Sequence, residues 1–566
     1  MRRSIASRNI LISCLTLTLC ALCALPITAD EERVVIQGAE VVGDSIEPHR
    51  FYGDVRDLPR VNHWEPGDPY VPSPRRWYGA DTSFETEAQL DPLVMQQRQV
   101  PARGAQTTIL QAFEGVDNGF LPDPSLDVGP NHVIHVVNAS AFAIYDKSGN
   151  ILAGPTALDS LGSGACATGR GDPIVLYDEA SDRWLLSEFS SGFGQCLYIS
   201  MTNDPVNGGW CQYLHPPGTD YQKYAFWPGV IVGTANEGNS PPVYLFDYDN
   251  MINCDTARPV QKLTGPGLPG LGFEAFTPAD RDGPNPPPAN TPAFMLRHRD
   301  TELGNQGPSL PTQDIIEVWQ VEVDFDNSSN TALTQLPDIL LSEFDSNLCP
   351  PISQFSCIPQ PGTGVRVDPL LEVVMYKVQY RNFGTHETMV AVLQTDIGDF
   401  EDHAGERWFE LRRTPAGSGD WTLFQEGTYS PDSDHRFMGA VGMDGSGNML
   451  MVYALSSSTT NPSVAFTGRL AGDPLGTMTE PEQIALAGAG NTGSIRFGDY
   501  SHLSLDPVDD CSFWFTVHYT EGTDNSAASI GSIRFNSCSG DTAEIFSDGF
   551  EAGDTDAWTI TDLGAP

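Results

Sequence analysis

The chain contains few positive charges, and very few of them are lysines. Its 566 residues include 30 Lys and Arg against 74 Asp and Glu, a formal net charge of −44 at pH 7. Only four lysines occur. A surface this acidic repels nucleic acids and anionic membranes, so neither is expected as a partner. Solubility in a salty medium, where ions screen self-repulsion, and Ca²⁺ binding by loop carboxylates are two compatible explanations of this charge.

Long apolar runs are absent after residue 27. A membrane-spanning helix needs ~20 consecutive apolar residues, and the one segment that approaches this length, 10–27, follows the basic stretch 1–8. The small residues Thr28 and Ala29 then precede an acidic run. This order predicts a secretory signal peptide over residues 1–29. We therefore expect a secreted protein, extracellular or on the cell surface, that does not insert into the membrane.

The common catalytic and cofactor motifs are missing too. The sequence has no Gly-x-Ser-x-Gly elbow, no His-Glu-x-x-His helix and no Walker loop. The 11 histidines are scattered, and beyond the apolar N-terminal segment no Cys-x-x-Cys pair occurs that would indicate a zinc site. The sequence therefore predicts no cofactor with the exception of Ca²⁺, for which weak candidates exist.

Those weak calcium candidates are short acidic turns. Asp444, Ser446 and Asn448 have the 1, 3, 5 spacing of a calcium loop, but Leu455 stands at the twelfth position, where a bidentate Glu is needed. A plain turn explains the same residues. Asp280 and Asp282 are equally ambiguous.

Cysteines are few but even in number once the signal peptide is removed. Eight remain, which in an exported chain favours disulfides. Cys511 and Cys538 flank two strand-like runs and should meet across a hairpin, and Cys349 with Cys357 should close a local loop. Two alternatives stay open for the remaining four cysteines. These are Cys166 with Cys196 and Cys211 with Cys254, or a bond between Cys196 and Cys211.

The sequence does contain an internal repeat. Three segments, 125–137, 442–453 and 504–517, each contain an apolar strand, an Asp, a tight turn and a second apolar strand, the pattern of a β-hairpin. Weaker relatives bring the markers to seven, near residues 125, 172, 227, 293, 368, 443 and 505. Repeated hairpins at such spacing predict an all-β fold, a seven-bladed β-propeller. One or more long β-sandwiches are the alternative.

The markers also divide the chain. We predict an extended, Pro-rich N-terminal arm over residues 30–104, the propeller over 105–538 and a short acidic tail over 539–566. The arm would lie on the main domain or be trimmed. We expect the protein to be a monomer.

Candidate ligand-binding residues follow from the propeller prediction. Residues just before the inner strands of all blades gather on one face of a central channel. A ring of cations beside carboxylates and aromatics there could hold an anionic sugar or a carboxylate. Ion pairs that join neighbouring blades would explain the same residues. The candidates are Asp123, Arg170, Asp172, Lys223, Tyr224, His435, Arg436, Arg496, Asp499 and Tyr500.

Over roughly residues 120–538, and most specifically in the second half of that region, the chain resembles a family of secreted bacterial proteins of unassigned function, usually described as β-propellers. The resemblance rests on the runs YRNFG at 380–384, RWFELR at 407–412, HRFMG at 435–439, MDGSGN at 443–448, RFGDYS at 496–501 and DPVDDC at 506–511. It implies the fold and the export but no catalytic residues. The first hairpin is also similar to the Asp-box of sialidase-type propellers through Ser125, Asp127 and Gly129, although its aromatic residue and the Arg-Ile-Pro motif are missing.

Two functions are therefore predicted from the sequence. The first is a secreted binding or surface-interaction protein whose ligand is an anionic glycan, a carboxylate or another extracellular molecule. The alternative is a sialidase-like glycan-active hydrolase or lyase that uses the same Arg, Asp and Tyr cluster. Whether the protein is an enzyme stays open at this point.

Overall fold

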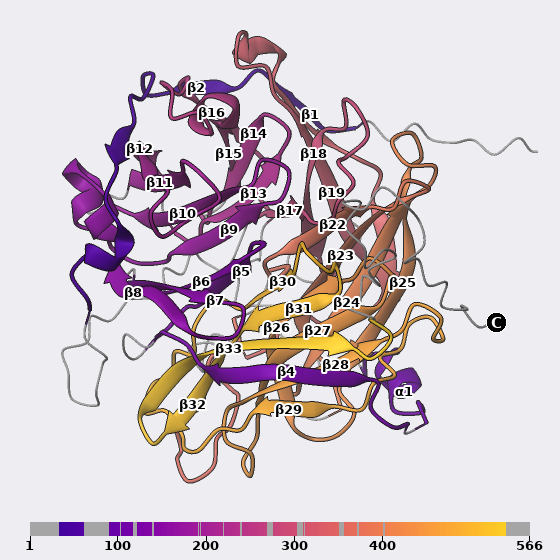
Figure 1. Ribbon diagram of the computed structural model, residues 1–566. Helices are drawn as coiled ribbons and strands as arrows, with labels where there is room; N and C mark the ends of the chain where they lie inside the picture. The colour runs from indigo at the N-terminus through magenta and orange to yellow at the C-terminus, as the bar shows by residue number, and fades with distance from the viewer. Residues whose placement is uncertain are drawn as a thin grey trace, which may run out of the picture.

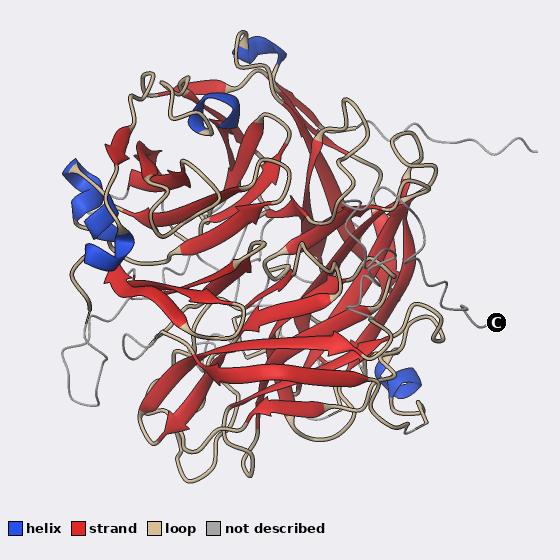
Figure 2. Ribbon diagram, viewed as in Figure 1, coloured by secondary structure: helices blue, strands red, loops and turns tan. Residues whose placement is uncertain are grey.

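A computed structural model describes most of the chain and shows an all-β protein (Figures 1 and 2). The described residues are 33–61, 90–101, 103–116, 121–138, 141–190, 192, 194–218, 220–237, 240–268, 275–302, 310, 312–349, 356–370, 373–399 and 402–538. The predicted signal peptide, 1–29, and tail, 539–566, lie outside them. Within these ranges no helix is long and apolar enough to cross a membrane.

Antiparallel hairpins along the chain build the first three sheets. The first contains β5 (Ser125–Val128), β6 (His132–Val137), β7 (Ala141–Asp146) and β8 (Ile151–Ala157). The second contains β9 (Ile174–Asp178), β10 (Arg183–Phe189), β11 (Gly194–Ser200), β12 (Trp210–Pro217) and β3 (His49–Phe51). The third contains β13 (Lys223–Trp227), β14 (Val230–Thr234), β15 (Pro242–Asp247), β16 (Val260–Thr264) and β2 (Glu40–Val42).

The next two strand groups merge into one ten-stranded sheet, because β17 and β22 pair in parallel. The first group contains β17 (Thr277–Arg281), β18 (Ala293–Arg299), β19 (Gln313–Glu322), β20 (Ala332–Gln335), β21 (Ile339–Ser342) and β1 (Val35–Gln37). The second contains β22 (Val378–Asn382), β23 (Glu387–Asp396), β24 (Ala404–Arg413) and β25 (Trp421–Tyr429).

The last two sheets complete the described chain. One contains β26 (His435–Met443), β27 (Met449–Ser456), β28 (Ser463–Arg469) and β29 (Gln483–Leu486). The other contains β30 (His502–Leu505), β31 (Ser512–Thr516), β32 (His518–Gly522), β33 (Asn525–Phe535) and β4 (Thr107–Glu114). The helices are single turns: α1 (Val94–Gln97), α2 (Tyr248–Met251), η1 (Val55–Asp57), η2 (Leu158–Leu161), η3 (Gly164–Ala167) and η4 (Ser328–Asn330).

The first strands of successive groups contact one another in chain order. The contacts run from β5 to β9, β13, β17, β22, β26 and β30, and from β30 back to β5; Figure 1 shows these strands facing a common centre. Side chains bond to the neighbouring backbone at several of these junctions. Asp127 of β5 accepts from the Tyr177 amide at 2.9 Å, and Asp280 of β17 accepts from the Phe226 amide at 2.8 Å. These buried carboxylates therefore join one strand group to the next.

All three hairpins that the internal repeat predicts are present. They are β5 with β6, β26 with β27 and β30 with β31. In the second, Asp444 accepts hydrogen bonds from the amides of Ser446 and Asn448 at 2.8 and 2.9 Å, and Gly447 has a φ of 82°. An Asp side chain that bonds the backbone ahead of it, followed by a glycine in the left-handed region, closes such turns without steric strain.

The N-terminal arm covers sheet edges. Its strands β3, β2 and β1 pair with the outer strands β12, β16 and β20 of three different groups. Farther along, Gln97 at the end of α1 exchanges hydrogen bonds with the backbone of Met478, at 2.8 and 2.9 Å. Strand β4 then pairs with β33, so the beginning of the predicted 105–538 region and its end share one sheet. Covered edges offer no template for pairing with a second molecule.

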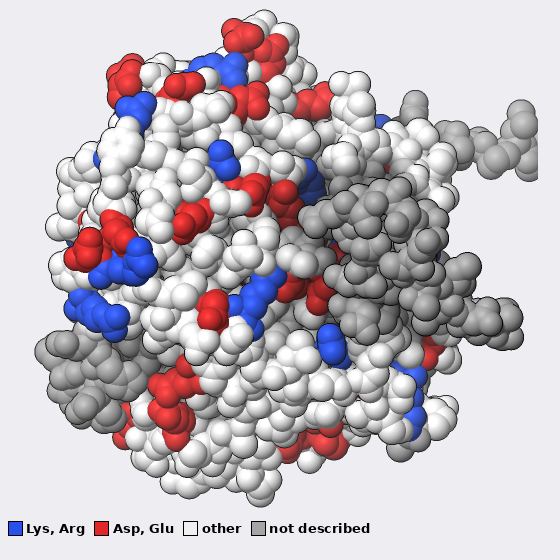
Figure 3. Space-filling model, viewed as in Figure 1, with Lys and Arg blue, Asp and Glu red and all other residues white. Residues whose placement is uncertain are grey.

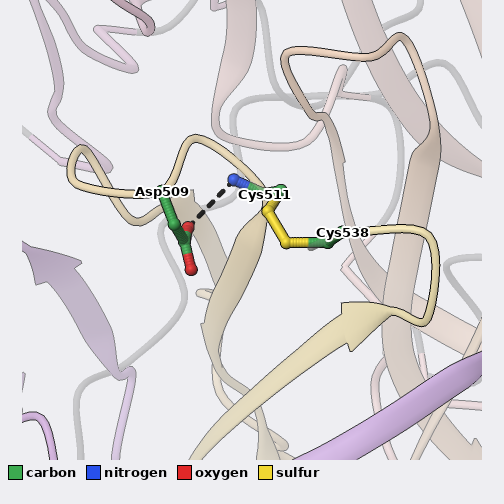
Figure 4. Close-up of side chains that lie close together, drawn as sticks. All are labelled: Asp509, Cys511 and Cys538. Carbon is green, nitrogen blue, oxygen red and sulfur yellow. Dashed lines mark hydrogen bonds between the residues drawn. A yellow bond between two sulfur atoms is a disulfide. The ribbon is translucent and has the colours of Figure 1, made fainter. Parts of the chain in front are cut away.

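Four disulfides are present, and they confirm both predicted pairs. Cys511 bonds to Cys538 and Cys349 to Cys357, while the open alternative resolves as Cys166 with Cys196 and Cys211 with Cys254. Figure 4 shows the first of these beside Asp509, which accepts a 3.0 Å hydrogen bond from the Cys511 amide. Four disulfides are typical of proteins that fold in an oxidising, extracytoplasmic compartment.

The Cys511–Cys538 bond should contribute substantially to stability. It joins residues 27 apart in the sequence, and closing a loop of this size lowers the entropy of the unfolded chain. We expect a Cys511→Ala, Cys538→Ala double variant to lose about 3 kcal/mol of the free energy of unfolding. Denaturant titrations of the two proteins measure this difference, and a loss below ~1 kcal/mol would contradict the chain-entropy account.

Candidate functional site

The candidate site is built around Lys223, the first residue of β13. Its ammonium nitrogen lies 3.6 Å from the centroid of the Tyr221 ring and 3.3 Å from that of Tyr500. The residue is 1% exposed, and Nζ has no hydrogen-bond partner among the described residues. A buried ammonium normally has a carboxylate or carbonyl acceptor. Lys223 instead lies between two aromatic faces.

Carboxylates from three other strand groups surround this lysine. Asp123 precedes β5, Asp172 precedes β9 and Asp499 precedes β30. Oδ1 of Asp123 accepts a 2.6 Å hydrogen bond from the Asp499 amide, and its Oδ2 accepts from the Asn138 side chain at 2.7 Å. Asp123 and Asp172 have positive φ angles of 35° and 52°, which Asp tolerates better than most residues. The backbone thus turns sharply where these strands begin.

Arg496 supplies the second cation of the site. Its Nη2 pairs with Oδ2 of Asp499 at 2.5 Å, whereas Nε and Nη1 are buried and have no hydrogen-bond partner among the described residues. The hydroxyl of Tyr500 is also buried, and no described residue bonds to it. The side chains of Arg496 and Asp499 are 13% and 16% exposed. They and the half-buried Asp172 are the partly exposed side chains of the site, which we call its rim, whereas Lys223 and Tyr500 are buried.

Burial dominates the electrostatics of the site. It raises the pKa of Asp172 to about 7, an effect to which the charges of Asp220 and Asp499 add. Burial likewise raises the pKa of Asp123 well above its ordinary value. It lowers the pKa of Lys223 well below the ordinary lysine value, although Asp172, Asp499 and Asp123 act in the opposite direction. Burial therefore favours the uncharged forms of both the carboxyl groups and the amine of this site.

Six of the ten candidates from the sequence belong to this cluster. We call it the Lys223–Arg496 site and define it by the following residues: Asp123, Asp172, Tyr221, Lys223, Arg496, Asp499 and Tyr500. Sequence reasoning missed Tyr221. Its position two residues before Lys223 was a weak signal, and the sequence did not indicate the positive φ of 51° that the backbone has at Tyr221.

The other four candidates lie elsewhere. Arg436 is fully buried and pairs with Glu482 at 2.9 Å and with Asp432 at 2.8 Å. These ion pairs indicate a structural role for Arg436. His435 contacts the ring of His403, with ring centroids 5.1 Å apart. Tyr224 donates from its hydroxyl to Gln195 at 2.8 Å, between β13 and β11. Arg170 is exposed and bonds through its amide to the Phe189 carbonyl.

The weak calcium candidates have other partners. Lys377 donates to Asp280 at 3.1 Å and to Asp282 at 2.9 Å, so a lysine ammonium already balances this carboxylate pair. Asp444 is bonded to its own turn, and its Oδ2 accepts from the Asn448 side chain at 2.8 Å. These contacts favour the plain-turn interpretation of Asp444 and Asn448.

Two further groups have the composition of metal sites. Asp300, Glu302 and Asp314 offer oxygens within 4.8 Å of one another, but Asp314 accepts from the amides of Thr301 and Phe344, both at 2.8 Å. The other group is Asp509 with Cys511 and Cys538, whose sulfurs form the disulfide in Figure 4. Backbone donors and a disulfide thus account for both groups.

A serine, a histidine and an aspartate also line up near β24. Nδ1 of His403 lies 2.5 Å from Asp399, and its Nε2 lies 3.4 Å from the Ser430 hydroxyl. Both Ser430 and His403 are fully buried, and the Asp434 carbonyl lies 3.2 Å from the same Nε2. Both ring nitrogens of His403 therefore already have partners within the fold. We interpret the row as a structural network.

Surface charge adds no large patch on the face shown in Figure 3. Acidic and basic side chains form small separate groups among uncharged residues there. The net negative charge of the chain is therefore spread out on this face. Any charge-based recognition must be local.

Comparison with known proteins does not place the chain in a family. No family model and no curated protein matches it. Among solved structures, Raptor of Chaetomium thermophilum aligns at 9% identity and a TM-score of 0.34, over 78% of this chain and 30% of that one. A polysaccharide lyase aligns at 9% identity and 0.34, over 80% and 98% of the two chains, and a lectin in complex with alpha methyl fucoside at 10% identity and 0.31, over 64% and 95%. These likenesses are too distant to carry an argument about function.

Proposed function

We propose that this protein is a secreted, monomeric seven-bladed β-propeller that binds an anionic glycan, or another carboxylate-bearing extracellular ligand, at the Lys223–Arg496 site. Seven successive strand groups and first-strand contacts that return from β30 to β5 support the propeller. The strand β4, from the N-terminal side, would complete the last blade beside β33. The parallel β17–β22 pairing would make two neighbouring blades continuous.

The observation that carries the binding proposal is a set of buried donors without acceptors. Nζ of Lys223, Nε and Nη1 of Arg496 and the hydroxyl of Tyr500 are all buried and unpartnered among the described residues. A buried polar group without a partner costs about 1–3 kcal/mol. A ligand rich in acceptor oxygens would satisfy several of these donors at once. A carboxylate is such a ligand, and its charge strengthens each hydrogen bond.

The acidic side chains of the site suit the rest of a sugar. Asp172 and Asp499 lie at the partly exposed rim, where their oxygens can accept from hydroxyl groups. The buried rings of Tyr221 and Tyr500 pack against each other, with centroids 5.5 Å apart, and would give the floor of the site an apolar character. An acidic sugar offers a carboxylate, hydroxyls and an apolar ring face together.

Binding should depend on both the ligand carboxylate and Arg496. We expect oligosaccharides that contain uronic acid to bind, and their neutral counterparts to bind at least ~10-fold more weakly, since a charged hydrogen bond contributes about 1.5–3 kcal/mol. Arg496→Gln should remove the preference. Calorimetry on both ligand sets measures it, with the exposed Arg56→Gln as the matched control. Equal binding of acidic and neutral sugars would contradict the proposal.

A hydrolytic or lytic function is the second candidate, and one observation favours it. Burial raises the pKa of Asp172 to about 7, and an acid or base works best when its pKa lies near the operating pH. Turnover of a panel of reporter glycosides by the wild type, lost in Asp172→Asn, would support this function. Binding without turnover would favour the non-catalytic one.

A further inference from the structure

We propose that Lys223 captures a carbonyl compound covalently as an imine, and that the preferred compound is a 2-oxo acid whose carboxylate contacts Arg496. This inference rests on the Lys223–Arg496 site of the proposed function and narrows its ligand class. It depends on Nζ of Lys223 acting as a nucleophile, rather than on the positive charge of the site. The argument starts from a comparison of the four lysines.

Three of the four lysines are paired with acids. Lys147 lies 2.6 Å from Asp506, Lys262 lies 2.7 Å from Glu237, and Lys377 lies 2.9 Å from Asp282. Lys223 alone among them has no carboxylate within 4.0 Å in the described structure. Its Nζ also lacks a hydrogen-bond partner there. A carboxylate partner favours the protonated ammonium, and only the neutral amine is a nucleophile.

Lys377 is the informative contrast because it is buried to a similar degree. Its side chain is 2% exposed, yet the charges of Asp282 and Asp280 outweigh burial and raise its pKa. Around Lys223, burial outweighs Asp172, Asp499, Asp123 and Asp220 and lowers the pKa. The rings of Tyr221 and Tyr500 favour a cation. They act against this lowering in the free amine, but they would stabilise an iminium once it forms.

The neighbouring groups can complete the reaction. The neutral amine adds to the carbonyl carbon and forms a carbinolamine. A proton from the Asp172 carboxyl then converts the carbinolamine hydroxyl into the water that leaves, and an iminium faces the new Asp172 carboxylate. No oxidant or reductant is needed. The unpartnered Nε and Nη1 of Arg496 are donors for the carboxylate of a 2-oxo acid.

The proposed route to the amine is through the partly exposed rim of the site. The side chain of Arg496 is 13% exposed and that of Asp499 is 16% exposed, while Asp172 is half-buried. Tyr500 and Lys223 themselves are buried. A small molecule of three or four carbons is therefore the appropriate probe.

The test is reductive trapping on the full chain. The protein is incubated with pyruvate and sodium cyanoborohydride at pH 7.5, and the alkylated lysines are located by peptide mapping. We expect Lys223 to be labelled at least ~10-fold faster than Lys147 or Lys262, because each unit by which a pKa is lowered raises the neutral fraction tenfold. The α-amino group is the internal positive control. The proposal would be overturned if the α-amino group were labelled and Lys223 were not. It would also be overturned if Lys147 and Lys262 were labelled as fast as Lys223.

A second arm tests the carboxylate. Propanal carries the carbonyl without the acid, so pyruvate should label Lys223 faster than propanal does in the wild type, and Arg496→Gln should abolish this preference. Equal rates in the wild type would overturn the 2-oxo acid assignment. Because peptide mapping locates the labelled lysine in the wild-type protein, the test does not depend on whether a Lys223→Met variant folds. Acidic-glycan binding without Lys223 labelling would retain the proposed function and reject the imine; the reverse result would reject the glycan and retain the imine.

Discussion

The Arg436→Ala variant is expected to lose about 3 kcal/mol or more of the free energy of unfolding. The guanidinium is fully buried, with Nε and Nη2 each 2.9 Å from Glu482 and Nη1 2.8 Å from Asp432. Nη1 also donates to the Asp434 carbonyl at 2.6 Å. Removing the arginine leaves Glu482 without its counter-ion and opens a cavity beneath it. Both effects destabilise the folded state.

Arg496→Ala is the comparison that gives this prediction its value. Arg496 makes one ion pair, with Asp499, near the rim of the site, so we expect its removal to cost less than half as much. Chemical denaturation of the wild type and both variants measures the two losses. If Arg496→Ala were as destabilising as Arg436→Ala, we would conclude that Arg496 holds the sheets together. That result would contradict a ligand-binding role for Arg496.

The second large effect is a dependence of stability on pH that originates at Glu406 of β24. This side chain is fully buried, and neither of its carboxylate oxygens has a hydrogen-bond partner among the described residues. Burial raises its pKa to about 8, and the Gly439 amide that faces it offsets only part of this. A glutamate in the unfolded chain titrates near ~4.3. Between these values the folded protein retains a proton that the unfolded chain has released.

The sign follows from this difference in bound protons. Because the folded state binds more protons between about pH 4.3 and pH 8, the free energy of unfolding falls as the pH rises through that window, by ~1.4 kcal/mol per pH unit. Below the window both states are protonated, and above it both are ionised. Glu406 should therefore make the protein about 4 kcal/mol less stable at pH 8 than at pH 5.

Glu406→Gln isolates this contribution. The amide is nearly the same size and does not titrate, so the variant should lose the pH dependence that Glu406 causes and keep that of other buried acids such as Asp314. Denaturation at pH 5, 6.5 and 8 gives the difference between the two profiles. Parallel profiles would show that Glu406 ionises normally in the folded protein. A variant that unfolds more readily at every pH would indicate a packing role instead.

The hairpins and the disulfide between Cys511 and Cys538 could be predicted because both depend on local sequence. The turn at 444–448 needs an Asp that bonds the following amides and a glycine at a positive φ, and all of these are neighbours in the chain. The two cysteines flank strands whose pairing the same alternation predicts. Between Cys166, Cys196, Cys211 and Cys254 the choice was open, since it depends on how distant loops lie over β11 and β12.

The candidate site was predicted in part. Asp123, Asp172, Lys223 and Asp499 could be found because each stands at the start of a strand that faces the common centre. Arg436 satisfied the same rule but has Glu482 as its partner, 46 residues farther along the chain. Whether a cation is paired depends on which side chain from another strand reaches it. No spacing within one segment contains that information.

The amino-acid sequence by itself determined the strand content, the turns, the cysteine pairs that flank predicted strands and the acidic balance of the surface. These features follow from backbone propensity, from alternating apolar side chains and from composition, which act over a few residues. Only the tertiary structure decided that Tyr221 and Tyr500 enclose Lys223 and that β17 pairs with β22. It also decided that Lys377 pairs with two acids, whereas Lys223 has no carboxylate within 4.0 Å among the described residues. Each of these depends on burial and on contacts between residues far apart in the chain, because the energy of a charge is set by the side chains and water that surround it.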